Sequence, residues 1–86
     1  MNIVFTQTCW DEYVYWQTQD KKAIRKINRL IKSIESNKPL EGEGKPEFLK
    51  FIKAYSLNID EKNRLVYRLT PTDIILLACK GHYDDK

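Results

Sequence analysis

The 86-residue chain is poor in the residues that several common classes of protein require. Its two cysteines, Cys9 and Cys79, are too few for the disulfide framework of a small secreted domain, and we expect buried thiols in a reducing compartment. One histidine and no Cys-x-x-Cys pair argue against a structural zinc site. The longest apolar run, residues 74–79, is too short to cross a bilayer, and the N-terminus lacks the features of a signal peptide. We therefore expect a soluble, cytoplasmic protein with no membrane partner.

What the chain does contain is enough apolar material for a single domain over residues 1–86. Hydrophobic residues make up 42% of the sequence and aromatic residues 12%, which argues against disorder although 31% of the residues are charged. A chain of this length has room for one modest core. The net charge of +3 permits an anionic partner such as nucleic acid but does not require one.

The hydrophobic pattern predicts two helices near the N-terminus. Residues 2–6 are typical of a strand, and Thr8 is expected to cap a first helix of about ten residues. Asp20 is expected to cap a second helix over residues 21–36, because apolar side chains recur there at helical spacing: Ile24, Ile27, Leu30, Ile31 and Ile34.

Strands follow the helices. Prolines and glycines predict a loop over residues 37–46, and residues 55–60 and 64–70 flank a turn typical of a hairpin. Residues 74–80 are predicted to form a strand, and the continuous apolar run over residues 74–79 predicts that it is central and covered on both faces. The order β-α-α-β-β-β indicates an α+β fold, with a mainly antiparallel sheet and both helices on one face.

A stripe of basic side chains lies on the other side of the second predicted helix, with no acid among them: Lys21, Lys22, Arg25, Lys26, Arg29 and Lys32. A solvated helix face is the commoner reason for such a stripe. A surface that binds phosphates or an acidic partner is the alternative.

Further along the chain, a few residues are suited to metal-free cleavage of RNA. Strand alternation places Arg64 and Arg68 on one face, opposite the apolar side chains of the same strand. Glu47 supplies a carboxylate at the edge of a strand, and His82 and Tyr83 follow the last one. Such chemistry needs a base (Glu or His), cations that stabilise a phosphorane, and an acid (His or Tyr). This composition permits the reaction but does not select it.

An ordered set of motifs runs along nearly the whole chain. It comprises Trp10-Asp11-Glu12-Tyr13 with Tyr15-Trp16, Lys26-Ile27-Asn28, Gly42-x-Gly44-Lys45-Pro46-Glu47 with Leu49-Lys50, Arg64-Leu65-Val66-Tyr67, Ala78-Cys79 and His82-Tyr83. Together they resemble the RelE/YoeB superfamily of toxins from bacterial type II toxin–antitoxin pairs, and above all its YoeB (Txe) branch.

The resemblance implies a microbial-ribonuclease-like fold and an mRNA interferase that cuts mRNA in the ribosomal A site without a cofactor. By matching motif, Glu47 would be the general base, His82 the general acid, Arg64 the phosphorane stabiliser and Tyr83 a positioning group, while Lys50 would neutralise phosphate. The basic side chains of the second helix would face ribosomal RNA: Lys22, Arg25, Lys26 and Arg29. Implied partners are the ribosome, mRNA, a YefM/Phd-type antitoxin that blocks the site, and a second copy of the chain.

The chain departs from the family pattern in its third strand. The family motif Ser-Arg-Arg-Ile corresponds to Ser56-Leu57-Asn58-Ile59, and the usual histidine before Arg-Leu-Val-Tyr is Asn63. We hypothesise that Arg68 partly replaces the missing guanidinium. One alternative is a catalytically weakened toxin that mainly binds its antitoxin. Another is a non-enzymatic, gyrase-inhibiting relative, against which His82-Tyr83 argues.

Overall fold

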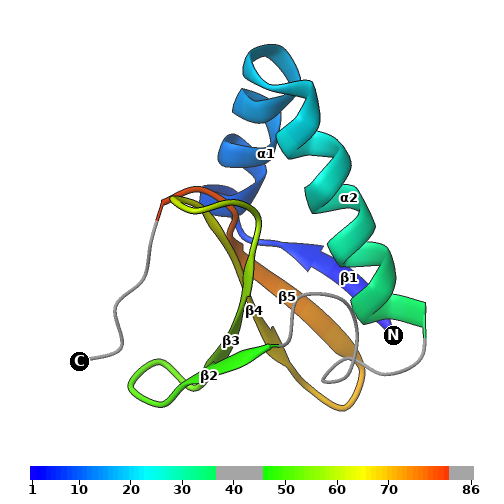
Figure 1. Cartoon of the computed structure of the whole chain (residues 1–86). Coiled ribbons are helices and arrows are strands. Elements are labelled where there is room, and N and C mark those ends of the chain that lie inside the picture. The colour runs from blue at the N-terminus through cyan, green and yellow to red at the C-terminus, as the bar shows by residue number, and fades with distance from the viewer. Residues whose placement is uncertain (37–45, 82–86) are drawn as a thin grey trace.

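The computed structural model describes residues 1–36 and 46–81, which form a five-stranded sheet with two helices on one face (Figure 1). In chain order the elements are β1 (Asn2–Phe5), α1 (Gln7–Gln19), α2 (Lys21–Ser36), β2 (Glu47–Leu49), β3 (Ala54–Asn58), β4 (Arg64–Leu69) and β5 (Asp73–Ala78). The α+β prediction is confirmed, including the hairpin formed by β3 and β4. The predicted order lacked β2, because a three-residue strand is too short for alternation to reveal it. Residues 37–45 of the predicted loop lie outside the described residues.

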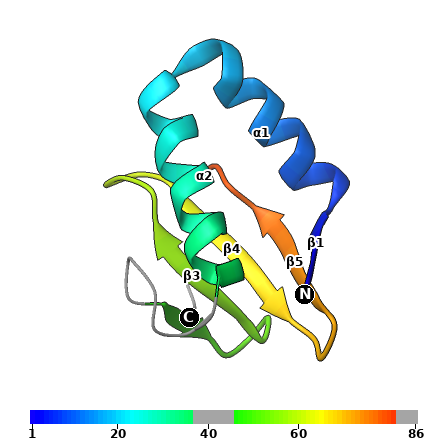
Figure 2. The same ribbon diagram turned by 90° about the vertical axis from the view of Figure 1, so that its right-hand side faces the viewer.

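The strands are ordered β1-β5-β4-β3-β2 across the sheet. β1 is parallel to β5, and every other neighbouring pair is antiparallel, as predicted. β5 lies inside the sheet, but its two faces are not equally covered. Ile74 and Leu76 are buried, whereas Ile75 and Leu77 are only half-buried. The prediction that both faces of this strand are covered was wrong, because the helices cover only one side of the sheet (Figure 2).

Each helix begins at a side chain that accepts backbone hydrogen bonds. Asp20 caps α2 as predicted, since its Oδ1 accepts from the N–H groups of Lys22 and Ala23 at 3.0 and 3.2 Å. Thr6, not Thr8, caps α1: its Oγ1 accepts from Cys9 N at 3.2 Å. The α1 helix thus begins directly after β1 and runs for 13 residues. No helix among residues 1–36 and 46–81 is long and apolar enough to span a membrane.

The main core lies between the helices and the sheet. It contains Ile27, Leu30 and Ile34 from α2 and Leu57, Leu65, Tyr67, Ile74 and Leu76 from the strands. Cys9 and Cys79 are buried in it as free thiols, which confirms the predicted burial of both side chains. Hydrogen bonding with Cys79, together with burial and nearby negative charge, raises the pKa of the Cys9 thiol far above its ordinary value. Burial, with a smaller effect of Tyr55, raises the pKa of Tyr67 to about 12. Burying each large apolar side chain contributes about 1.5–3 kcal/mol, so this core fixes the strand register.

The sheet face turned away from the helices, called the outer face below, carries a smaller apolar cluster. Leu49, Ala54, Val66 and Ala78 are buried in it. The alternation predicted for β4 is confirmed, because Leu65 and Tyr67 belong to the helix-side core while Val66 lies on the outer face. The outer face therefore also receives the two arginines of β4.

Candidate active site

Glu47 on β2 and Arg64 on β4 meet on the outer face, although 17 positions separate them in the sequence. Arg64 Nη2 donates to Glu47 Oε2 at 3.0 Å. The arginine side chain is 14% exposed and the glutamate side chain 58%. The guanidinium is thus held by its surroundings, while the carboxylate is open to an approaching molecule.

The strand register explains why these two groups meet. Glu47 pairs with Ser56, and Ser56 pairs with Val66, so β3 lies between the two charged residues. A slip of one residue would turn the β4 arginines toward the helices and expel Leu65 from the core. The burial of the helix-side core therefore also sets the geometry of the ion pair.

Two buried polar atoms next to the ion pair make no hydrogen bond with the residues that the structure describes. They are Ser56 Oγ and Arg64 Nε. An unmade hydrogen bond of a buried group is unfavourable by about 1–3 kcal/mol, and a catalytic role or a bound water is a common reason for such a group. Sequence reasoning had not assigned a role to Ser56.

The chain that leads from β5 toward residue 82 is fastened beside Arg64. Arg64 N donates to Gly81 O at 3.0 Å, and Gly81 N donates to Asn63 Oδ1 at 2.8 Å. Gly81 has a φ of 88°, a left-handed conformation that other residues adopt only with strain. The predicted site residues His82 and Tyr83 lie outside the described residues.

The α1 helix holds the same segment from the other side. Glu12 Oε1 accepts from Cys79 N, and Trp16 Nε1 donates to Cys79 O, each at 2.8 Å. In the sequence, both residues stand out only as parts of a family motif. Nothing in their spacing reveals a partner more than 60 positions away.

Asn63 joins the β3–β4 turn to the segment that follows β5, a role that sequence reasoning missed. Its side-chain amide donates to Asp60, whose Oδ1 also accepts from Lys62 N and Asn63 N at 2.7 and 2.8 Å. Burial alone would raise the pKa of Asp60, but hydrogen bonds from Asn63 and Lys62 outweigh it and hold the pKa below its ordinary value. An aspartate followed three positions later by an asparagine is typical of a turn, and this signal was present in the sequence.

Replacing Asn63 with alanine is expected to loosen the segment before residue 82. The change removes the side-chain bonds to Asp60 and Gly81, each worth about 0.5–1.5 kcal/mol. For a domain of this size Tm should fall by roughly 4–8 °C for each kcal/mol lost, and the Gly81 amide should exchange faster with deuterium. Glu61→Ala, in the same turn, is the control. Unchanged Tm and Gly81 exchange would contradict this role.

The structure does not bring all of the remaining predicted site residues to the Glu47–Arg64 pair. Arg68 lies on the outer face, but its Nη2 donates to Ile52 O at 2.8 Å, at the end of β4 away from Arg64. Lys50 is exposed directly after β2. The basic stripe of α2 lies across the sheet from Glu47 and Arg64, on the helix side, so the structure does not bring it to the ion pair: Lys22, Arg25, Lys26 and Arg29.

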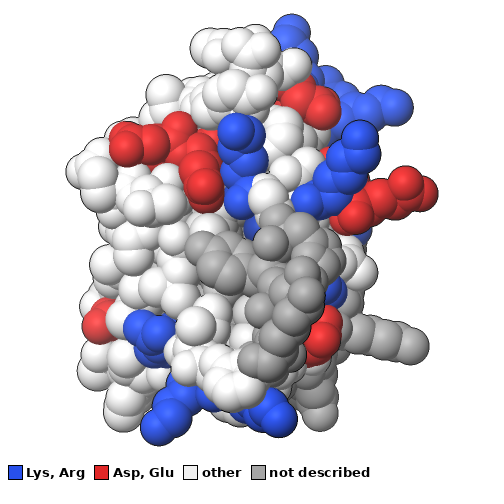
Figure 3. Space-filling model, turned by 90° about the vertical axis from the view of Figure 1, so that its left-hand side faces the viewer, with Lys and Arg blue, Asp and Glu red and all other residues white. Residues whose placement is uncertain are grey.

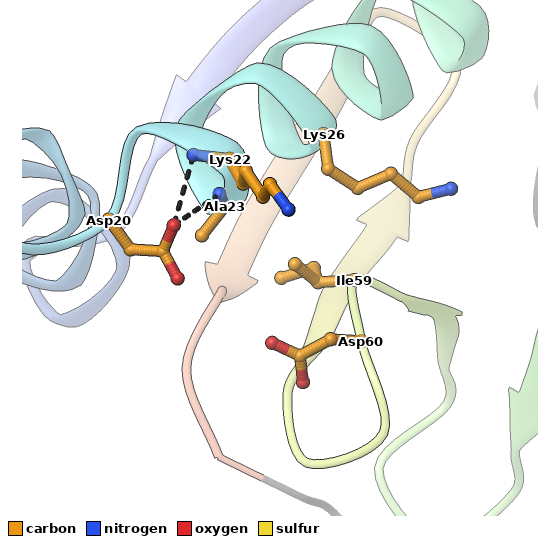
Figure 4. A pocket seen from close by; sticks show the side chains of 6 residues that line it. All are labelled: Asp20, Lys22, Ala23, Lys26, Ile59 and Asp60. Atoms are coloured by element: carbon orange, nitrogen blue, oxygen red, sulfur yellow. Dashed lines mark hydrogen bonds between the residues drawn. The ribbon is translucent and has the colours of Figure 1, made fainter.

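A hollow of about 340 Å³ lies where α2 begins beside the β3–β4 turn. It is lined by Asp20, Lys22, Ala23, Lys26, Ile59 and Asp60 (Figure 4). Lys22, Lys26 and the capping Asp20 border it from the side of α2, and Asp60 borders it from the β3–β4 turn. This balance of charge does not favour an anion. Within residues 1–36 and 46–81, no group of three His, Cys, Asp or Glu side chains is placed to hold a metal ion.

Comparison with known proteins identifies the family. A sequence profile described as the YoeB-like toxin of bacterial type II toxin–antitoxin systems matches residues 5–83. The chain belongs to this family. It is 42% identical over 85 residues to Toxin YoeB of Escherichia coli K12, covering 96% of this chain and all of that protein.

Solved structures of YoeB toxins share the fold. The YoeB dimer from Staphylococcus aureus superposes with a TM-score of 0.88 at 45% identity, over 96% of this chain and 98% of that one. The YoeB-YefM complex from the same organism gives 0.85 at 42% identity, over the same shares of the two chains. The predicted membership of the YoeB branch is confirmed, and the chain is a toxin of a type II toxin–antitoxin system.

Proposed function

We propose that this YoeB-family toxin is a ribosome-dependent endoribonuclease that cleaves mRNA in the A site and thereby inhibits translation. The observation that carries the proposal is the Glu47–Arg64 pair, in which a solvent-open carboxylate lies 3.0 Å from a guanidinium on the outer face. A base next to a fixed positive charge is what attack of a ribose hydroxyl on a phosphate requires. Family membership supports the same activity.

In the proposed reaction the carboxylate of Glu47 removes the proton of the 2′-hydroxyl. The 2′-oxygen then forms a bond to the adjacent phosphorus, and the bond from phosphorus to the 5′-oxygen breaks. His82 donates a proton to that departing oxygen. The products are a 2′,3′-cyclic phosphate and a 5′-hydroxyl end, and protons move only between side chains and RNA.

Arg64 would stabilise the charge that develops on the phosphorane oxygens. Its planar guanidinium has five N–H donors, so it can bind a phosphate oxygen while it stays near Glu47. Arg64 Nε, which has no partner among the described residues, would gain one if the side chain shifted toward the phosphate. Lys50 would neutralise a neighbouring phosphate and Tyr83 would position the substrate, as the family resemblance implies.

The proposal is tested by mixing the purified protein with ribosomes that carry an mRNA and, separately, with the naked mRNA. Cleavage is expected only on the ribosomes, with cyclic phosphate at the new 3′ ends. Equal cleavage of naked mRNA would show a ribosome-independent nuclease instead. No cleavage of either RNA would favour the weakened toxin described below.

Two protein partners are proposed from the relatives. The S. aureus structures named as a YoeB-YefM complex and a YoeB dimer suggest a YefM/Phd-type antitoxin and a homodimer for this chain. The antitoxin's C-terminal segment would cover the Glu47–Arg64 pair. An antitoxin that binds but leaves cleavage on ribosomes unchanged would contradict this placement, and sedimentation of the free toxin as a monomer would contradict the dimer.

A weakened toxin is the second candidate, and the third strand favours it. Leu57 is 1% exposed within the helix-side core, so that position does not face the site. Asn58 pairs with Arg64 on the outer face, where the family motif has an arginine. The chain therefore lacks one guanidinium at the site, and the loss of one such donor typically lowers the rate by about 10²–10³. Such a protein would act mainly as an antitoxin-binding partner or corepressor.

Asn58→Arg is expected to raise cleavage on programmed ribosomes, because it returns a guanidinium to the site beside Arg64. The gain should be on the order of tenfold or more in the single-turnover rate, given what one such donor contributes. Asn58→Gln, which adds length without charge, is the matched control and should change little. If the arginine variant cleaves no faster, position 58 does not limit this enzyme.

A further inference from the structure

The turn between β2 and β3 exposes apolar side chains next to cations. Phe51 is 64% exposed and Ile52 37%, and Phe48, on the adjoining strand β2, is 50% exposed. Lys50 and Lys53 lie in the same turn, and residues 48–59 include no carboxylate. A cluster of exposed apolar side chains is typical of an interaction site, and this charge suits an anionic partner.

The turn is held firmly against the sheet. Arg68 Nη2 donates to Ile52 O at 2.8 Å, which ties the turn to β4. The ring of Phe48 lies 5.2 Å from that of Tyr55, which stacks at 5.6 Å on the buried Tyr67. Lys53 adopts a left-handed backbone with φ of 52°, which reverses the chain sharply. The exposed side chains are therefore presented by a scaffold and not by a loose loop.

Rings and cations in this arrangement are what single-stranded nucleic acid binds. Bases stack on aromatic side chains, and Lys and Arg follow the phosphates. Lys50 Nζ lies 5.3 Å from the centre of the Phe51 ring, so the cation and the ring are presented together. In Figure 3, Lys and Arg side chains gather at the lower edge of the molecule, the end at which Figure 1 draws this turn.

The turn continues directly from the candidate site. Paired residues of neighbouring strands form rows across the outer face. Leu49 and Ala54 form the row nearest the turn, next to Arg68. Glu47, Ser56 and Val66 form a row two residues away along the strands. That separation is roughly 7 Å along the strands, and the row of Asn58 and Arg64 lies roughly 7 Å further from the turn. Because the Arg64 side chain reaches back to Glu47, an RNA strand bound at this ion pair would need to extend only a short way to reach the turn.

We propose that the β2–β3 turn is a docking surface for single-stranded RNA, on which a base next to the scissile linkage stacks against Phe51. The inference rests on the proposed function, since it places the RNA relative to Glu47 and Arg64. Lys53 and Arg68 supply charge for the flanking phosphates, and Arg68 also holds the turn in place.

The test uses a fluorescent 2′-O-methyl hexanucleotide, which cannot be cleaved because its 2′-oxygens carry no proton. Its affinity is measured by anisotropy at low salt, beside that of an abasic strand of the same length and charge. Phe51→Ala is expected to weaken binding of the base-containing strand by about 5- to 100-fold, with little effect on the abasic strand. Phe51→Trp should preserve binding, while Phe51→Leu, which keeps apolar bulk without a ring, should not.

The outcomes separate this inference from the proposed function, which is tested by cleavage on ribosomes. The inference is overturned if wild type and Phe51→Ala bind the hexanucleotide with equal affinity, or if Phe51→Ala weakens binding of the base-containing and the abasic strand equally. It is also overturned if the wild type does not bind the hexanucleotide. If RNA binding is unchanged while Phe51→Ala weakens binding of the antitoxin or of a second copy, the turn is a protein interface and the inference is wrong. If the toxin binds the strand through Phe51 but does not cleave mRNA on ribosomes, the docking surface is supported and the proposed endoribonuclease activity is contradicted.

Discussion

Glu47→Gln is expected to lower the single-turnover rate of mRNA cleavage on programmed ribosomes by about 10²–10⁴, the usual contribution of a positioned general base. The substitution keeps the shape of the side chain and one oxygen near Arg64, but the amide cannot accept the proton of the 2′-hydroxyl. Stability should change little, because an ion pair with one half-exposed partner is worth about 0–1 kcal/mol. Cleavage and thermal unfolding are measured on the same samples.

Glu61→Gln is the matched control for that result, because it removes an exposed carboxylate from the β3–β4 turn without touching the ion pair. It should cleave like the wild type. A Glu47→Gln protein that retains full cleavage would show that another group takes the proton. A loss of cleavage with a matching loss of stability would instead indicate a structural role for Glu47.

Arg64→Ala should lower the cleavage rate by about 10²–10³, because it removes the only guanidinium that the described residues bring to Glu47. Arg64→Lys is expected to recover only part of the rate, since an ammonium keeps the charge but cannot bind two oxygens in a plane. The backbone bond from residue 64 to Gly81 does not depend on the side chain, so the segment before residue 82 should stay in place.

Lys62→Ala serves as the control for the loss of one positive charge near the site, and it should change the rate by less than Arg64→Lys. Hydrogen exchange at Gly81 checks that the Arg64 variants keep the nearby backbone. Full activity of Arg64→Ala would contradict the placement of the phosphorane beside this residue. It would also remove the reason for expecting a gain from Asn58→Arg.

Much of the fold could be predicted from local patterns in the sequence. The apolar spacing of α2 and its Asp20 cap were clear, because both signals lie within one helix. The start of α1 was misplaced by two residues, because Thr6 and Thr8 are equally good caps and only the end of β1 decides between them. The burial of the outer face of β5 was overestimated, because an apolar sequence does not show which face of a strand the helices leave exposed.

The site was less accessible to sequence reasoning. The alternation in β4 correctly placed Arg64 and Arg68 on one face. The approach of Arg64 to Glu47, however, depends on the register of three strands. Only the family resemblance joined the two residues in advance. The contacts of Asn63 with Gly81 and of Glu12 with Cys79 could not be predicted, because they join segments that only the folded chain brings together.

The position of β5 has a consequence for synthesis of the toxin. This strand leaves the ribosome after the others, yet it lies between β1 and β4, so the two parts of the sheet cannot join until it emerges. Contacts between distant parts of a chain also slow folding. A partly translated toxin thus lacks the finished sheet and the backbone anchor beside Arg64.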